Sequence, residues 1–169
     1  MNIIPSLPLP KNQIKRDEKG RFVSVTEKNS EEPPLPNSIT DALQGNLLGD
    51  GSILFNKKTA EGKARPNTNA QYCMTLKPWD YISHLWSNFY RAICTSNPPK
   101  GWPNPKKGKP ISQYHFKSRA LPQLTKLHSL WYRWDESLKK YIKRVPLNIG
   151  DLLTAVGLAH WIPRTGYPC

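Results

Sequence analysis

A chain of 169 residues has room for one domain with a hydrophobic core and little more. Its net charge is +13, of which +12 falls in residues 38–169, with 19 basic and seven acidic side chains, so a polyanionic partner is indicated, nucleic acid before an acidic membrane. The three widely spaced cysteines, Cys73, Cys94 and Cys169, argue against a disulfide framework and a CxxC zinc site, and no apolar run has transmembrane length.

Residues 1–37 hold six prolines among Lys, Glu, Ser and Asn, a composition that predicts a flexible leader. Residues 1–10 lack the charged start and apolar middle of a secretory signal, and they are too rich in proline for an amphipathic transit peptide. Within the leader, residues 15–23 have the pattern of a small hairpin with Gly20 in its turn. The composition favours a disordered tail over this hairpin.

The first predicted helix begins near Ser38, as N-cap, with Asp41 in the capping-box position. Gly45 and Gly49 are four residues apart, so another backbone could approach that helix face closely. Asp50 then places a carboxylate at the C-terminal end of the helix, where the dipole disfavours it and a positive group must offset it. Two interpretations stay open at this point: a bound divalent cation, or an ordinary helix end and turn.

Residues 52–56 and 71–77 alternate in polarity and predict a pair of antiparallel strands joined by a polar connection. One face of the pair is apolar and predicted to be core: Ile53, Phe55, Tyr72, Met74 and Leu76. The other face offers hydroxyl, amide and ammonium groups, which can read base edges or hold phosphates. A half-solvated sheet of any other function has the same alternation.

An amphipathic helix is predicted over residues 79–94, and a second over residues 122–134 that directs Leu124, Leu127, Leu130, Trp131 and Trp134 to the core. Between them, residues 97–110 hold five prolines and four lysines and predict a loop or irregular edge hairpin. Residues 111–118 predict a strand with Tyr114 and Phe116 inward. The expected order is α-β-β-α-β-β-α.

Residues 43–51, LQGNLLGDG, resemble the signature of the LAGLIDADG homing endonucleases. They keep its first Leu, its first Gly, its acidic eighth position (Asp50) and its final Gly, whereas Leu48 replaces its first Asp. The succession LLGDGSI, QYCMTLK, NPP, QYHFKS, KRVP and LAHWI is similar to the large, two-motif organellar branch of that family. The resemblance implies an α+β half-domain over residues 38–147, with a concave, basic antiparallel sheet backed by helices.

The resemblance also implies the site. Asp50 would hold a divalent cation, Mg²⁺, and Lys143, just ahead of a hydrophobic-Pro pair, would reach the cleavage centre and stabilise the charge on the scissile phosphate. Gly45 and Gly49 would form a helix interface. The outward residues expected to contact double-stranded DNA are Ser52, Leu54, Asn56, Lys57, Gln71, Thr75, Lys77, Gln113, His115 and Lys117.

Residues 148–169 depart from the family pattern. Residues 152–162 resemble the start of the second LAGLIDADG helix, with Ala155, Gly157 and Ala159 as its small residues, but Pro163 is expected to break that helix and Thr165 stands where the second catalytic acid belongs. This predicts a chain truncated at its second motif, with impaired cleavage. Two chains associating through the first helix, as a homodimer, would supply two copies of Asp50, although residues 152–162 compete for that surface.

Three functions therefore remain open from the sequence. The first is a metal-dependent LAGLIDADG endonuclease that cuts double-stranded DNA. The second is a non-catalytic, intron-RNA-binding maturase, and the third is an unrelated basic RNA-binding domain in which Asp50 is only a turn residue. The resemblance implies an organelle-encoded protein, mitochondrial or chloroplast. The sequence has neither a basic amphipathic helix nor a long apolar run, so no membrane partner is expected.

Overall fold

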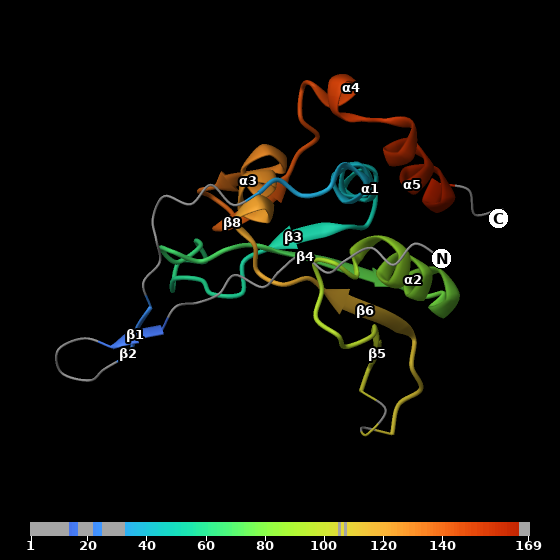
Figure 1. Cartoon of the computed structure of the whole chain (residues 1–169), viewed down its shortest axis with the longest axis horizontal. Helices are drawn as coiled ribbons and strands as arrows, with labels where there is room; N and C mark the ends of the chain where they lie inside the picture. The colour runs from blue at the N-terminus through green and yellow to red at the C-terminus, as the bar shows by residue number, and fades with distance from the viewer. Residues whose placement is uncertain (1–13, 17–21, 25–32, 105, 107, 166–169) are drawn as a thin grey trace.

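A computed structural model of the chain describes residues 14–16, 22–24, 33–104, 106 and 108–165 (Figure 1). Within the predicted leader, β1 (Ile14–Arg16) and β2 (Phe22–Ser24) pair antiparallel, with Ile14 opposite Ser24. These two strands are the ones that the hairpin pattern of residues 15–23 allowed. Its turn, with Gly20, and the rest of residues 1–32 lie outside the described residues.

The central sheet has four antiparallel strands in the spatial order β3-β4-β6-β5. These strands are β3 (Ser52–Leu54), β4 (Gln71–Leu76), β5 (Lys100–Trp102) and β6 (Gln113–Lys117). The predicted alternation is confirmed, because Ile53, Phe55, Tyr72, Met74 and Phe116 are all buried. Strand β5 is the edge strand that the proline-rich stretch forms by pairing with β6.

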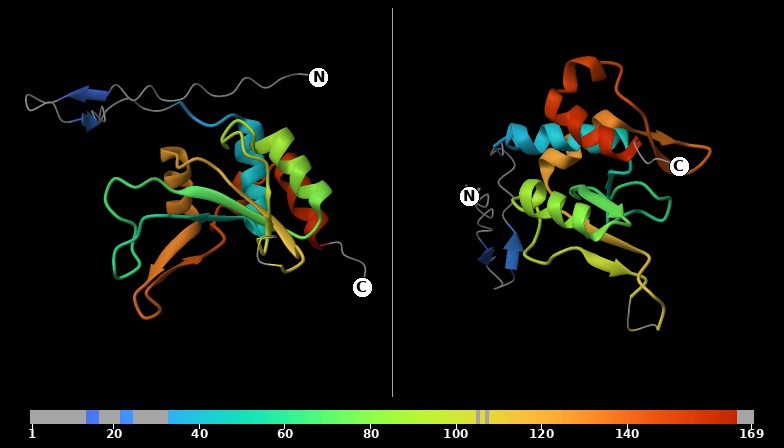
Figure 2. Two further views of the ribbon diagram at one scale, coloured as in Figure 1. Left: turned by 90° about the horizontal axis from the view of Figure 1, so that it is seen from below. Right: turned by 90° about the vertical axis from the view of Figure 1, so that its right-hand side faces the viewer.

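Helices cover one face of this sheet (Figure 2). They are α1 (Asn37–Leu48), α2 (Trp79–Leu85), which continues into the π-helical turn η1 (Trp86–Tyr90), and α3 (Pro122–Trp131). Two buried polar pairs join them: Trp131 Nε1 donates to Gln44 Oε1 at 2.8 Å, and Asn46 Nδ2 donates to the Tyr90 hydroxyl at 2.6 Å. The α+β class with an antiparallel sheet, predicted from the sequence, is confirmed.

The start of α1 differs from the prediction. Pro36 is the N-cap, and no side chain caps the helix, so the capping box expected from Ser38 and Asp41 is wrong. The Pro36 carbonyl instead accepts the backbone N–H groups of Ile39 and Thr40, at 3.0 and 3.1 Å. Because the side chain of Pro36 has no oxygen, it cannot cap the helix as a hydroxyl would.

The predicted helix over residues 122–134 ends early, at Trp131. Tyr132 turns into extended backbone and begins a second, two-stranded sheet, β7 (Tyr132–Asp135) and β8 (Lys140–Lys143). Trp134 therefore leaves the core and lies on this hairpin, edge-on to Tyr141 with ring centroids 5.1 Å apart. Leu130 is 38% exposed, so the apolar face of the helix is shorter than predicted.

The last described elements are α4 (Ile149–Leu152) and α5 (Ala155–Thr165), and α5 packs against α1 (Figure 1). A methyl group on Gly45 would overlap the backbone carbonyl of Gly157, so the two helices touch backbone to backbone. Of the three small residues expected at this contact, only Gly157 is buried; Ala155 and Ala159 are exposed. The helix also continues through Pro163 to Thr165, so the predicted break at Pro163 is wrong.

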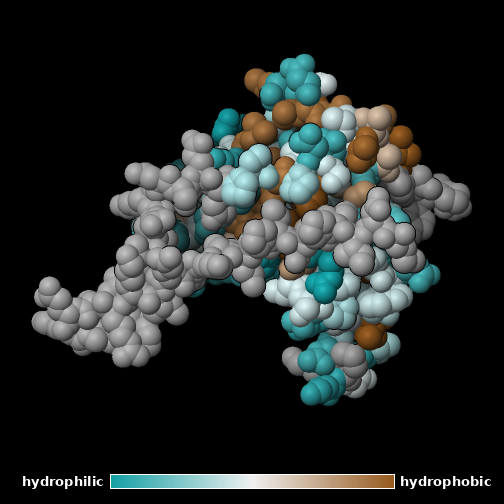
Figure 3. Space-filling view, in the orientation of Figure 1, coloured by the Kyte–Doolittle hydropathy of each residue, from teal (hydrophilic) through white to brown (hydrophobic). Residues whose placement is uncertain are grey.

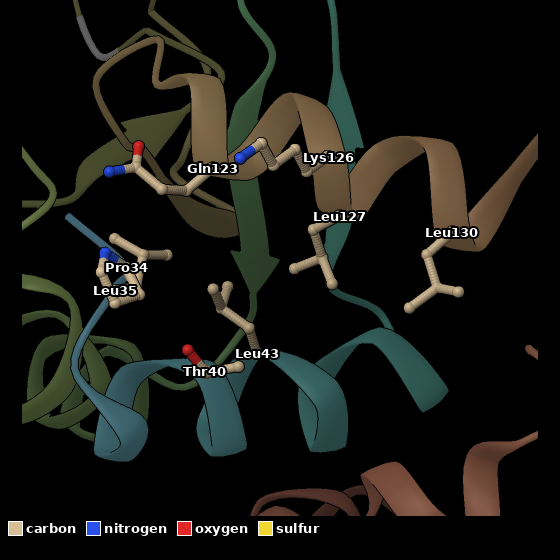
Figure 4. Close-up of a pocket in the computed structure, with 8 residues that line it drawn as sticks. All are labelled: Pro34, Leu35, Thr40, Leu43, Gln123, Lys126, Leu127 and Leu130. Carbon is tan, nitrogen blue, oxygen red and sulfur yellow. The ribbon is translucent and has the colours of Figure 1, made fainter. Parts of the chain in front are cut away.

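The surfaces above and below the sheet differ in character. Apolar side chains gather over the C-terminal helices, where Val156, Leu158 and Ile162 are exposed (Figure 3). Between α1 and α3 lies a hollow of about 500 Å³, with Leu43, Leu127 and Leu130 in its walls and Lys126 at its rim (Figure 4). None of its lining residues comes from the sheet.

Among the described residues, no helix is long and apolar enough to cross a membrane.

Candidate functional site

Asp50 lies in the tight turn between α1 and β3, with its side chain exposed. Gly49 ends the helix, and the N–H groups of Gly49 and Gly51 both donate to the Asn46 carbonyl, at 3.1 and 2.9 Å. A methyl group on Gly51 would lie 2.7 Å from that carbonyl oxygen and 2.9 Å from the Tyr72 hydroxyl. The turn that presents Asp50 therefore leaves no space for a side chain at position 51.

Lys143, at the end of β8, reaches this turn. Its ammonium donates to the carbonyl of Gly49 at 2.8 Å and to the carbonyl of Gly51 at 3.0 Å, so it contacts the residues on both sides of Asp50. The sequence required a positive group at this negative end of the helix dipole. In the structure Lys143 supplies it, from a strand more than 90 residues away along the chain.

The side-chain ligand that this turn offers is an oxygen, the exposed carboxylate of Asp50, because the carbonyls of Gly49 and Gly51 already accept the Lys143 ammonium. Hard cations such as Mg²⁺ prefer oxygen, and they often use one or two carboxylates together with water and substrate phosphate. Within the described part of the chain, no group of three or more His, Cys, Asp or Glu side chains lies together. Among the described residues, the carboxylate that this turn itself offers to a cation is that of Asp50. The side chain of Thr165 lies outside what the structure describes.

The residues expected to contact DNA mostly lie on the sheet face opposite the helices. Leu54 pairs with Gln71, and Thr75 pairs with His115, so these side chains share that face with their alternate neighbours along each strand. Asn56 donates to the Gln71 side chain, which ties two of the expected contact residues together. The remaining members are exposed or half-buried: Ser52, Lys57, Lys77, Gln113 and Lys117.

Strand β5 adds two side chains to this face that the sequence reasoning did not assign to the site. Lys100 pairs with His115, and Trp102, 54% exposed, pairs with Gln113. The four lysines of residues 97–110 add positive charge to this stretch. An edge strand that lies among prolines, however, has no alternating pattern by which the sequence could predict it. Lys100, His115 and Lys117 line a small hollow of about 180 Å³ at this end of the face.

The electrostatic character of that hollow shows in His115. Partial burial lowers the pKa of His115, and the neighbouring ammonium groups of Lys117 and Lys100 lower it further. Protonation of His115 is thus disfavoured, because it would place a third positive charge beside those of Lys117 and Lys100. The face is electropositive, as a surface that binds a polyanion should be.

The two glycines predicted as a helix interface have different surroundings. Gly45 lies under α5, whereas Gly49 ends α1 and gives its carbonyl to Lys143. The α1 face on which a homodimer was expected to form is covered by α5 of the same chain. His160 extends that contact, with its ring edge-on to Phe89 at 4.3 Å between centroids.

An aromatic cluster supports the hairpin that carries Lys143. His128 stacks on Tyr132 with centroids 4.5 Å apart and an interplanar angle of 6°, and it meets Phe55 and Tyr141 edge-on. Burial, followed by the charge of Lys58, lowers the pKa of His128 to about 4. The cluster therefore holds a neutral imidazole at physiological pH.

This cluster predicts a pH dependence of stability. Below pH 6.5 the unfolded chain binds a proton at His128 that the folded chain does not, so the free energy of unfolding falls as the pH falls and levels off near pH 4. From pH 7 to pH 5 the His128 share of this loss is about 2 kcal/mol. Urea titrations across this range should show a weaker dependence in His128→Phe. His84→Phe, at an exposed position, is the control. If the free energy of unfolding of His128→Phe depends on pH as steeply as that of the wild type, the role given to His128 is contradicted.

Comparison with known proteins gives three findings. Residues 40–168 match the model of the LAGLIDADG DNA endonuclease family. The chain is 32% identical, over 136 residues, to the cytochrome b mRNA maturase bI2 of Saccharomyces cerevisiae, a match that covers 79% of this chain and 30% of that protein. The fold is similar to that of the homing endonuclease I-WcaI bound to its DNA recognition sequence, with a TM-score of 0.55, 21% identity, and coverage of 80% of this chain and 57% of the other. The chain thus spans less than a third of the length of the curated relative.

Proposed function

This chain belongs to the LAGLIDADG DNA endonuclease family, and from that premise we propose that it binds double-stranded DNA on the outer face of its sheet and contributes Asp50 to a metal-dependent cleavage site. The observation that carries the proposal is the pair of hydrogen bonds from Lys143 to the carbonyls on both sides of Asp50. They place the Lys143 ammonium on the turn that carries Asp50, beside the basic sheet.

Each residue has a distinct role in this proposal. Asp50 holds a divalent cation, Mg²⁺, whose chemistry is to generate hydroxide and neutralise the leaving oxygen. Lys143 stabilises negative charge on the scissile phosphate, because its ammonium already lies within reach of the same turn. The outer face of the sheet grips the duplex and sets the position of the phosphate. One carboxylate is fewer than a two-metal site requires, so cleavage by this chain alone is expected to be slow.

The proposal is tested by selecting targets from a library of random duplexes with the purified chain. The chain should retain a defined duplex with a submicromolar Kd, and Mg²⁺ should support cleavage of that duplex where EDTA abolishes it. Equal affinity for every duplex and for single-stranded RNA, with no metal-dependent cleavage, would overturn the proposal.

The charge of the sheet face gives a separate prediction. Lys117→Ala should weaken duplex binding about threefold to tenfold, and it should reduce the slope of log Kd against log salt by about one, because one phosphate contact is lost. Fluorescence anisotropy at several NaCl concentrations measures both quantities. Lys126→Ala removes the same charge from α3, beside the hollow of Figure 4. It should leave the Kd and the salt slope equal to those of the wild type within experimental error.

A second candidate function rests on the maturase relative. A chain that binds intron RNA needs the basic face but not a complete metal site, and the relative bears the name cytochrome b mRNA maturase. Tight binding to a structured intron RNA that duplex DNA does not displace, and that Asp50→Asn leaves unchanged, would favour this function over cleavage. The same relative supports the proposal that the protein is encoded and acts in an organelle, the mitochondrion.

A further inference from the structure

Three hydrogen bonds join the β7–β8 hairpin to the segment that carries Asp50. Lys143 on β8 contacts the carbonyls of Gly49 and Gly51, and the hydroxyl of Tyr132 on β7 accepts the backbone N–H of Ile53 at 3.0 Å. Tyr132 and Lys143 face each other directly across the two strands. The hairpin is therefore hydrogen-bonded to Gly49 and Gly51, the residues immediately before and after Asp50.

The position of the Tyr132 hydroxyl is itself fixed by packing. Its ring lies flat on His128 of α3, and His128 meets Phe55, two residues beyond Ile53, with centroids 4.6 Å apart. Tyr132 is thus held from α3 on one side and from the strand after Asp50 on the other. Removing its hydroxyl leaves the Ile53 N–H without this acceptor but keeps the ring stack.

A lysine side chain alone does not define a geometry, since its four-carbon stem carries about 2 kcal/mol of rotamer entropy. Whether its ammonium bridges both carbonyls depends on where the backbone of β8 lies relative to the turn. The bond from the Ile53 N–H to the Tyr132 hydroxyl sets that separation, because Ile53 lies two residues after Gly51 and Tyr132 is the cross-strand partner of Lys143.

We propose that Tyr132 is a positioning residue that holds the Lys143 ammonium on the two carbonyls flanking Asp50. It contacts neither of those carbonyls through any hydrogen bond described above, and it acts through the paired strands. The consequence for cleavage rests on the proposed function, whereas the consequence for the position of Lys143 does not.

The test compares Tyr132→Phe with Tyr141→Phe. Tyr141 belongs to the same hairpin and the same aromatic cluster, and its hydroxyl also accepts a backbone N–H, that of Ala64 at 3.3 Å, but in the connection between β3 and β4. Both variants lose one hydroxyl and keep the ring. Only the first loses a bond beside Asp50.

Two measurements by NMR need no activity. In Tyr132→Phe the Ile53 amide should exchange with solvent at least tenfold faster, and the Lys143 ammonium signal should lose its protection from exchange. Tyr141→Phe should leave both within about twofold. A Lys143 signal that is equally protected in the two variants would overturn the proposal, whatever the chain does to DNA.

Cleavage supplies the third measurement. On the selected duplex, Tyr132→Phe should slow single-turnover cleavage about tenfold with Kd changed less than twofold, and it should have no further effect when Lys143 is already replaced by Met. Additive losses in the double variant would overturn the proposal. If no variant cleaves, wild type included, the proposed function fails and the NMR comparison still decides the role of Tyr132.

Discussion

Replacing Asp50 with Asn is expected to lower Mg²⁺-dependent cleavage of the selected duplex by at least about a hundredfold, with the affinity for the duplex unchanged within about twofold. The amide keeps the size and polarity of the carboxylate but loses the charge that is proposed to hold a divalent cation. Because the side chain is exposed in its turn, the substitution adds no cavity and buries no new polar group.

Single-turnover cleavage over a range of Mg²⁺ concentrations measures this effect, with duplex binding measured in parallel in EDTA. Asp151→Asn is the matched control, because Asp151 is an exposed carboxylate on α4. This variant should cleave the duplex as the wild type does. Cleavage by Asp50→Asn at the wild-type rate would show that the acid is only a turn residue. A parallel loss of binding would mean that the charge acts on the duplex and not through a cation.

Replacing Gly45 with Ala is expected to lower the free energy of unfolding by about 3 kcal/mol, the upper end of the cost of overpacking. The new methyl group would overlap the backbone carbonyl of Gly157. The methyl group is fixed to the α1 backbone and the carbonyl belongs to the α5 backbone, so neither can rotate away as the end of a flexible side chain can. Relief requires α5 to move away from α1. Amides of α5 should then exchange with solvent faster than those of the sheet.

Urea unfolding and hydrogen exchange measure the two parts of this prediction. Gly150→Ala is the control: it makes the same change on α4, where a methyl group would have no neighbour within 4 Å, and its stability should stay within about 0.5 kcal/mol of the wild type. A Gly45→Ala protein as stable as this control, with α5 still protected, would contradict the close contact between the helices.

The sequence predicted the parts of the fold that local pattern controls. The alternation in β3, β4 and β6 reveals which side chains face the core, and the glycines before Asp50 mark both a close helix contact and a helix end. The resemblance to a family directed attention to Lys143, a residue that charge pattern alone assigns to solvent. Its carbonyl partners appear only when the hairpin of β7 and β8 is folded onto the turn.

The errors fall where tertiary contacts override local pattern. Trp131 and Trp134 have the spacing of one helix face, but Tyr132 leaves the helix, pairs across to Lys143 and accepts the N–H of Ile53, none of which a local window contains. Pro163 lies within α5, although proline in a helix interior usually ends or kinks it, and nothing in the described contacts explains this. The edge strand β5 depends on its partner β6 and carries no alternation of its own.

The separation of 92 and 94 residues between Lys143 and its two carbonyl partners has a consequence for protein synthesis. A nascent chain that has left the ribosome as far as α3 already displays the acid and most of the basic sheet, but not the ammonium that completes the pair. Contacts between such distant positions form late, after the loop between them has closed. On the proposed function, a growing chain would display its nucleic-acid face before the ammonium of the proposed cleavage site is in place.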